Sequence, residues 1–374
     1  MTFRVANSGK KVLRNCHRQL CWSRHEYGVS MNIKKSILFA LAIVGWMSVA
    51  AANAQGMKWH PGHYVMFAMG DSQTQHLANM NEIANDTTIQ GVQIRILWNT
   101  LEKSKGVYDF SSIDAYLKKL KSLPVPKRLV VRIHDRKFNT TSTSGIVPTY
   151  LLTESIYNGG LTKTSTGYAA RLWEQPVMDR LIALYKAIGA RYDSDPYFEG
   201  IASSETTLSL INSNWPAGYS HKALMTQYKR LVSSVRPAMP RSNLFLYTNW
   251  MGNDNLMAEL IQSLIEPRAA AGGANVTPNK PTQGQRVWTG QLGADYRGIL
   301  ALSSSVETGE LGNFTPKQIN DYAYNTLRVN HLFWVRNTYS GSADKRWSTG
   351  ILPFLRTNPP IRTTCPSSIA ICLN

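Results

Sequence analysis

One pattern recurs along the sequence and limits the fold more than any other feature. A short apolar run is followed by a loop and then by a stretch with helical periodicity. Eight apolar runs occur, at about 63–70, 92–98, 128–134, 198–205, 244–250, 286–291, 299–307 and 331–337. The helical stretches lie at about 75–84, 113–120, 177–192, 223–235, 256–265 and 317–329. Apolar runs without strict alternation are typical of parallel strands that are covered on both faces.

Eight strands alternating with helices predict an α/β protein. Such a chain closes most economically as a (β/α)8 TIM barrel, and its length suits a single domain over residues 55–374. An open, doubly wound sheet is the alternative. That fold normally carries a glycine-rich phosphate loop after an early strand, and this sequence has none there. We therefore expect the barrel.

The N-terminal residues predict export. Residues 31–54 have a basic start, an apolar run over 37–49, and a small-residue cleavage motif before Gln55. The run is shorter than the ~20 residues of a spanning helix, so we expect no membrane span after cleavage. An uncleaved anchor is the alternative. The basic, patternless residues 1–30 that precede this signal peptide are expected to be a spurious extension. We expect a protein that is secreted or periplasmic in a bacterium.

The net charge narrows the classes of partner. The whole chain has 41 Lys and Arg residues against 23 Asp and Glu, a formal charge of +18. Residues 1–54 hold eight of the basic residues and one of the acidic ones, so the mature chain carries +11. That charge would suit a location near a polyanionic wall or matrix. Because the sequence has no dense stripe of basic residues, we expect no nucleic-acid binding. Nothing in the sequence indicates the oligomeric state.

Cysteine and histidine usage bears on the tail and on cofactors. The mature chain keeps two cysteines, Cys365 and Cys372. In an exported protein, such a close pair predicts a disulfide that pins the C-terminal tail, with two free thiols as the alternative. The histidines are scattered, without an H-x-x-x-H or H-E-x-x-H motif, so we expect neither a metal nor another cofactor. The sequence lacks a G-x-S-x-G elbow, the motif that would indicate a serine hydrolase.

Two isolated glutamates end the fourth and seventh predicted strands. Glu205 and Glu307 each follow small or apolar residues and have uncharged sequence neighbours. In a (β/α)8 barrel, functional groups lie at the C-terminal ends of the strands, so these two side chains would meet across the barrel mouth. Hydrolysis of a glycosidic bond requires such a pair of carboxylates. Alternatively, each glutamate caps the following helix or pairs with a nearby arginine.

The sequence resembles clan A of the retaining glycoside hydrolases, at the level of pattern over most of residues 60–340. Segment 98–114, WNTLEKSKGVYDFSSID, is similar to the W…E…G-x-Y-D-F…D segment that follows strand two in several of its families. The resemblance implies that Glu205 is the acid/base and Glu307 the nucleophile. One residue departs from the pattern: the clan usually has Asn before the acid/base, and this chain has Ser204. The family and the sugar are therefore left open.

Other polar and aromatic residues at predicted strand ends are candidates for binding substrate. Trp98, Trp250 and Trp334 could stack on sugar rings, and the clan usually places such a tryptophan on strand eight; the alternative is that they fill the core. Arg95 and His134 could bind the nucleophile or the sugar, or serve as internal partners. The full set of candidates is Arg95, Trp98, His134, Asn249, Trp250, Gln291 and Trp334.

Taken together, the residues and the resemblance predict an exported glycoside hydrolase that cleaves a polysaccharide or oligosaccharide with retention. Its two carboxyl groups would then lie about 5–5.5 Å apart. A non-catalytic carbohydrate-binding barrel derived from such an enzyme is the first alternative. An inverting hydrolase, with carboxylates ~6.5–9.5 Å apart, and an adhesion protein that binds acidic polymers are the others.

Overall fold

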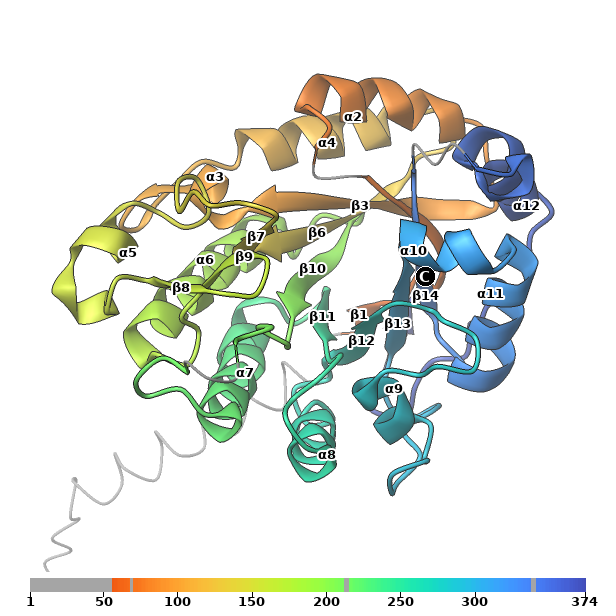
Figure 1. Cartoon of the computed structure of the whole chain (residues 1–374). Coiled ribbons are helices and arrows are strands. Elements are labelled where there is room, and N and C mark those ends of the chain that lie inside the picture. The colour runs from red at the N-terminus through yellow and green to blue at the C-terminus, as the bar shows by residue number, and fades with distance from the viewer. Residues whose placement is uncertain (1–55, 68–69, 212–214, 338–340) are drawn as a thin grey trace, which may run out of the picture. The chain divides into compact units, whose positions relative to one another are not determined.

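Eight parallel strands close into a barrel, as the sequence predicts (Figure 1). The order around the barrel is the order along the chain, and the last strand pairs with the first, with His331 opposite Gly62. The strands are β2 (Gly62–Met66), β3 (Ile89–Leu97), β6 (Arg128–His134), β10 (Phe198–Glu205), β11 (Asn243–Tyr247), β12 (Ala270–Ala274), β13 (Leu302–Val306) and β14 (His331–Val335). The (β/α)8 barrel is thereby confirmed.

The computed structural model describes residues 56–67, 70–211, 215–337 and 341–374, and these belong to one compact unit. The predicted extension over 1–30 and the predicted signal peptide over 31–54 lie outside the described residues and stay predictions. No helix in the described ranges is both long enough and apolar enough to span a bilayer.

Amphipathic helices cover the outside of the barrel. The principal ones are α2 (Gln73–Asn79), α4 (Ser111–Lys121), α6 (Gln175–Tyr192), α7 (His221–Val235), α8 (Asp254–Gln262), α9 (Gln283–Trp288), α10 (Thr308–Asn313), α11 (Pro316–Tyr322) and α12 (Leu352–Arg356). In α4, the buried side chains are Ile113, Tyr116, Leu117 and Leu120. This spacing puts them on one face of a helix, so burial of that face fixes α4 against the barrel.

The sixth strand is not where the sequence predicts it. The predicted strand over 286–291 falls on helix α9 and the turn after it, while the observed strand β12 has the sequence Ala-Ala-Gly-Gly-Ala. Small residues are required there. A Cβ on Gly272 would lie 2.8 Å from Ser303 Oγ, and one on Gly273 would lie 3.3 Å from the ring of Trp288. The strand lacks β-branched residues because its neighbours pack directly on its backbone.

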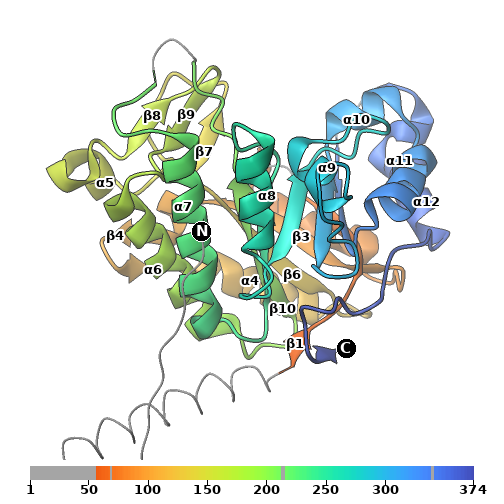
Figure 2. The same ribbon diagram turned by 90° about the horizontal axis from the view of Figure 1, so that it is seen from below.

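Two small sheets lie at opposite ends of the barrel. Strand β1 (Met57–Lys58) pairs with β15 (Cys372–Leu373), next to the disulfide that joins Cys365 and Cys372. Strands β7 (Arg136–Phe138), β8 (Leu161–Lys163) and β9 (Gly167–Ala170) form an antiparallel sheet after β6. Figure 2 shows this sheet far from β1 and the C-terminus, so it stands at the end of the barrel where the strands terminate.

A buried carboxylate joins several elements at the N-terminal end of the barrel. Glu199 is fully buried; its Oε2 lies 2.7 Å from His60 Nδ1, and its Oε1 accepts a hydrogen bond of 2.9 Å from Asn243 Nδ2. His331 Nε2 lies 3.5 Å from Oε1. Burial opposes ionisation, but the hydrogen bonds from His331 and His60 outweigh it and lower the pKa of Glu199 to about 2. Glu199 therefore remains a paired carboxylate above that pH.

Glu199→Ala should lower the free energy of unfolding by about 3–5 kcal/mol, because it leaves several buried polar partners without their acceptor. The measurement is urea unfolding at pH 7. Glu259→Ala is the control, because Glu259 pairs with Lys229 on the surface and its loss should cost at most about 1 kcal/mol. Equal losses in the two variants would contradict a structural role for the Glu199 cluster.

Candidate active site

The two predicted catalytic glutamates lie at the C-terminal ends of their strands. Glu205 is the last residue of β10, and Glu307 follows β13 directly and precedes α10. Their side chains are 23% and 28% exposed. Each carboxylate is thus held by the protein on one side and open to solvent on the other, as a group that acts on a bound ligand must be.

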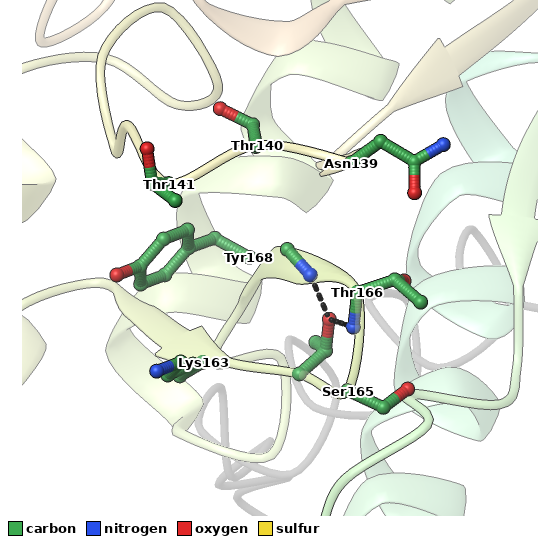
Figure 3. Close-up of a pocket in the computed structure, with 9 residues that line it drawn as sticks. Asn139, Thr140, Thr141, Lys163, Ser165, Thr166 and Tyr168 are labelled. Atoms are coloured by element: carbon green, nitrogen blue, oxygen red, sulfur yellow. Dashed lines mark hydrogen bonds between the residues drawn. The ribbon is translucent and has the colours of Figure 1, made fainter.

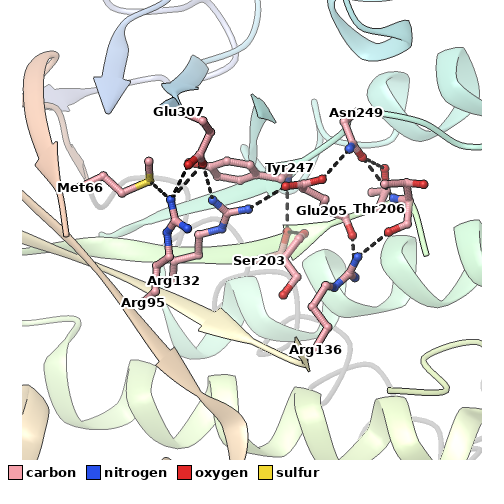
Figure 4. A network of polar contacts seen from close by, with 12 residues as sticks. Met66, Arg95, Arg132, Arg136, Ser203, Glu205, Thr206, Tyr247, Asn249 and Glu307 are labelled. Carbon is pink, nitrogen blue, oxygen red and sulfur yellow. Dashed lines mark hydrogen bonds and ion pairs between the residues drawn. The ribbon is translucent and has the colours of Figure 1, made fainter. Parts of the chain in front are cut away.

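One buried guanidinium contacts both carboxylates (Figure 4). Arg132, on β6, is 2% exposed; its Nη2 lies 3.5 Å from Glu205 Oε1 and its Nη1 lies 3.9 Å from Glu307 Oε1. The centre of this guanidinium is 4.0 Å from the centroid of the Tyr247 ring, on β11. Because the same side chain contacts both glutamates, they face one another across the interior of the barrel mouth.

A second arginine holds Glu307. Arg95, on β3, donates from Nη2 to both carboxylate oxygens of Glu307 at 2.9 Å, and the same nitrogen lies 2.8 Å from Met66 Sδ. This contact is with the predicted nucleophile and is also an internal ion pair, so it fits both alternatives for Arg95. A carboxylate that accepts hydrogen bonds at both oxygens from a guanidinium is fixed in orientation.

An amide from the next strand holds Glu205. Asn249 follows β11 and donates from Nδ2 to Glu205 Oε2 at 2.8 Å. Its Oδ1 accepts from the backbone N–H of Thr207 at 3.1 Å, which fixes the amide relative to the loop after Glu205. Ser204 does not take part: it is buried, and its hydroxyl donates to the carbonyl of Ile133 and accepts from the N–H of Asp135.

His134 lies at the end of β6 and is buried. Burial, followed by the charges of Arg132, Arg95 and Arg136, keeps its pKa well below the usual range, so the ring is neutral. Neither ring nitrogen of His134 has a hydrogen-bond partner within the ranges that the structure describes. Its predicted contact with the sugar or with Glu307 stays a prediction.

Three predicted substrate-binding residues lie elsewhere. Trp98 is completely buried and donates to Glu102 Oε2 at 2.8 Å, so its core alternative holds. Trp334 is also completely buried and donates to His63 Nδ1 at 3.0 Å, which corrects the prediction that it stacks on sugar. Gln291 lies exposed in a turn after α9, because the strand that was expected to end there is a helix. Trp250 is 40% exposed beside Asn249, as a binding residue must be.

The sequence prediction missed two residues of the site. Arg132 lies two residues before His134, and strand alternation puts both on the same face of β6, so its inward position could have been inferred. Glu310 lies one helical turn after Glu307 and accepts a 2.6 Å hydrogen bond from the backbone N–H of Glu307. Burial, together with the negative charge of Glu307, raises the pKa of Glu310 to about 7.

A separate pocket lies on the small antiparallel sheet (Figure 3). Its lining is rich in hydroxyl groups, with Thr140, Thr141, Thr166 and Tyr168 around it, and carries one charged side chain, Lys163. It does not contain the glutamate pair. The described residues contain no group of three or more His, Cys, Asp or Glu side chains placed to hold a metal ion.

Comparison with known proteins supports the fold. No protein-family model matches the chain, and no curated protein matches it. Among solved structures, the catalytic domain of β-amylase from Paenibacillus polymyxa is similar, with a TM-score of 0.56, 11% identity, and coverage of 80% of this chain and 98% of that one. Endo-glycoceramidase II from Rhodococcus sp. is similar with a TM-score of 0.50, 12% identity, and coverage of 82% and 80%. At these identities the likeness shows the barrel fold alone.

Glu310→Gln should change the pH dependence of stability. A carboxyl with a raised pKa binds its proton more tightly in the folded state, so stability falls as pH rises from about 4.5 to about 7 and stays lower above. Glutamine keeps the acceptor for the N–H of Glu307 but cannot ionise. The variant should match the wild type at pH 4 and exceed it at pH 8 by on the order of 2 kcal/mol. Chemical unfolding at both pH values measures this, and a difference that does not change with pH would contradict it.

Proposed function

We propose that this protein is an exported glycoside hydrolase that cleaves O-glycosidic bonds of a polysaccharide or oligosaccharide by a two-glutamate retaining mechanism. The observation that carries the proposal is the pair Glu205 and Glu307, partly exposed at the barrel mouth and contacted by the same guanidinium. The predicted signal peptide supports export, and with it a secreted or periplasmic location. The closed barrel is the fold that the resemblance to clan A implies.

The roles follow from the partners of each carboxylate. Glu307 is bound at both oxygens by Arg95, which fixes the orientation of its carboxylate and suits it to the role of nucleophile. Glu205 has the amide of Asn249 at 2.8 Å and the guanidinium of Arg132 at 3.5 Å as partners, and the resemblance to clan A assigns it the role of acid/base. In the first step, Glu205 protonates the leaving oxygen while Glu307 attacks the anomeric carbon. In the second step, Glu205 takes a proton from the water that releases the sugar.

The experiment begins with products released from a panel of bacterial and plant polysaccharides and identified by mass. On the substrate so found, Glu205→Ala and Glu307→Ala should each lower kcat/KM by about 10³-fold or more. Azide should restore part of the turnover of Glu205→Ala on an activated aryl glycoside and yield a glycosyl azide of retained configuration. Glu259→Ala, a surface glutamate on α8, is the matched control and should keep full activity.

Two results would contradict the proposal. Unchanged kcat/KM in Glu205→Ala or Glu307→Ala would remove the assigned residues from the reaction. A product of inverted configuration, observed by NMR before the sugar mutarotates, would show an inverting hydrolase instead.

A non-catalytic carbohydrate-binding barrel is the second candidate, and the position of Ser204 favours it. The hydroxyl of Ser204 is hydrogen-bonded to the backbone of residues 133 and 135. It therefore does not take the place of the Asn amide that clan A usually has at this position. This candidate predicts oligosaccharide binding by both the wild type and Glu307→Ala, with no release of products by either.

A further inference from the structure

An aromatic pocket lies beside Glu205, and of the residues that line it only Trp250 has been considered for substrate binding so far. It has a volume of about 240 Å³, and its lining includes Thr207, Leu210, Trp215, Tyr219, His221 and Trp250. Trp215 and Trp250 are 44% and 40% exposed and are the only tryptophans among the exposed large hydrophobic residues of the described chain. Exposed indoles gathered in one pocket indicate a surface that is built to receive a ligand.

The rings of this pocket fix one another. His221 lies between the two indoles, with its centroid 4.9 Å from that of Trp215 and 4.7 Å from that of Trp250, at interplanar angles of 88° and 86°. Tyr219 meets Trp215 at 5.1 Å and 87°. These are edge-to-face contacts, which orient the indoles while leaving each of them partly exposed. The two indoles are therefore oriented by contacts within the protein.

Hydrogen bonds join the pocket to Glu205. Asn249, which donates to the carboxylate of Glu205, is the residue before Trp250. Its Oδ1 accepts from the N–H of Thr207, and the hydroxyl of Thr206 donates to the carbonyl of Trp250 at 2.9 Å. Hydrogen bonds thus join the carboxylate to the wall of the pocket through the segments that follow β10 and β11. A ligand in this pocket lies on the Glu205 side of the catalytic pair.

The lining of the pocket selects the kind of ligand. The described residues that line it include no Lys, Arg, Asp or Glu, and burial lowers the pKa of His221, so this lining carries no charge at neutral pH. An indole offers an apolar face that suits the C–H face of a pyranose ring, and the hydroxyls of Thr207 and Ser209 offer hydrogen-bond partners. A uronic acid or a sulfated sugar would find no cation to pair with its charge.

We propose that Trp215 and Trp250 form the leaving-group subsite, which binds a neutral pyranose unit on the far side of the bond that is cleaved. This inference rests on the proposed function, because a general acid at Glu205 places the leaving group on its own side. The enzyme would then act on neutral saccharide chains rather than on glycosides of small alcohols, although its net charge is positive.

The test compares two kinds of probe. The first is the best substrate among cellohexaose, laminarihexaose, xylohexaose, chitohexaose and maltohexaose. The second is the glycosyl fluoride of the same sugar, whose small leaving group does not reach the pocket. Trp215→Ala and Trp250→Ala should each lower kcat/KM for the hexasaccharide at least about tenfold and leave the fluoride within about twofold. Retained hydrolysis of the fluoride shows that each variant is folded.

Phe138→Ala is the matched control, because Phe138 is an exposed aromatic residue that does not line this pocket. It should leave both probes unchanged. Equal effects of the tryptophan variants on both probes, or none on the hexasaccharide, would overturn the subsite while leaving the hydrolase in place. If the wild type hydrolyses neither probe, the proposed function fails instead. Calorimetric binding of the five hexasaccharides to Glu307→Gln still tests whether the pocket binds sugar. Trp215→Ala in that background should weaken binding about tenfold. Unchanged binding would overturn the subsite.

Discussion

The contact of Arg132 with both glutamates is the interaction on which the rest of the site depends. A guanidinium that is almost wholly buried is costly unless it is paired. Here Glu205 lies 3.5 Å from Nη2, Glu307 lies 3.9 Å from Nη1, and the ring of Tyr247 packs on the guanidinium. Nε and Nη1 have no hydrogen-bond partner among the described residues, so the two carboxylates are the charges that compensate the buried cation. The alignment of the pair is therefore a consequence of how the interior of the barrel is stabilised, and it does not depend on the loops alone.

At Ser204 the site departs from the clan A pattern, and the structure shows which side chain contacts the predicted acid/base instead. The hydroxyl of Ser204 is hydrogen-bonded to the backbone at the end of the neighbouring strand, so it is not available to a sugar. The amide that contacts the predicted acid/base comes from Asn249, one strand further round the barrel. Asn249 also fixes the loop that leads into the aromatic pocket. The same side chain thus links the orientation of Glu205 to the place where a leaving group would bind.

Much of the fold could be predicted because burial on both faces gives most of the strands a recognisable run of apolar residues. Strand β12 has no such apolar run, since it consists of alanine and glycine, and Ser303 and Trp288 lie too close to Gly272 and Gly273 for larger side chains. The strand-end rule placed Glu205 and Glu307 correctly at the ends of β10 and β13. It could not show that Trp98 and Trp334 are buried, because the depth of a side chain depends on packing between distant segments. For the same reason the aromatic pocket, with Trp215 and His221 from the loop and helix after β10, was not predicted.

The central claim is that Glu307 attacks the sugar while Glu205 acts from the other side. Trapping the covalent intermediate tests it most directly. The enzyme would be incubated with an activated 2-deoxy-2-fluoroglycoside of the sugar that it hydrolyses, digested, and analysed by peptide mass spectrometry. The account predicts one glycosyl group per protein, attached to Glu307, with none on a Glu307→Gln variant. A label on another residue, or steady hydrolysis of the natural substrate without any trapped adduct, would contradict it.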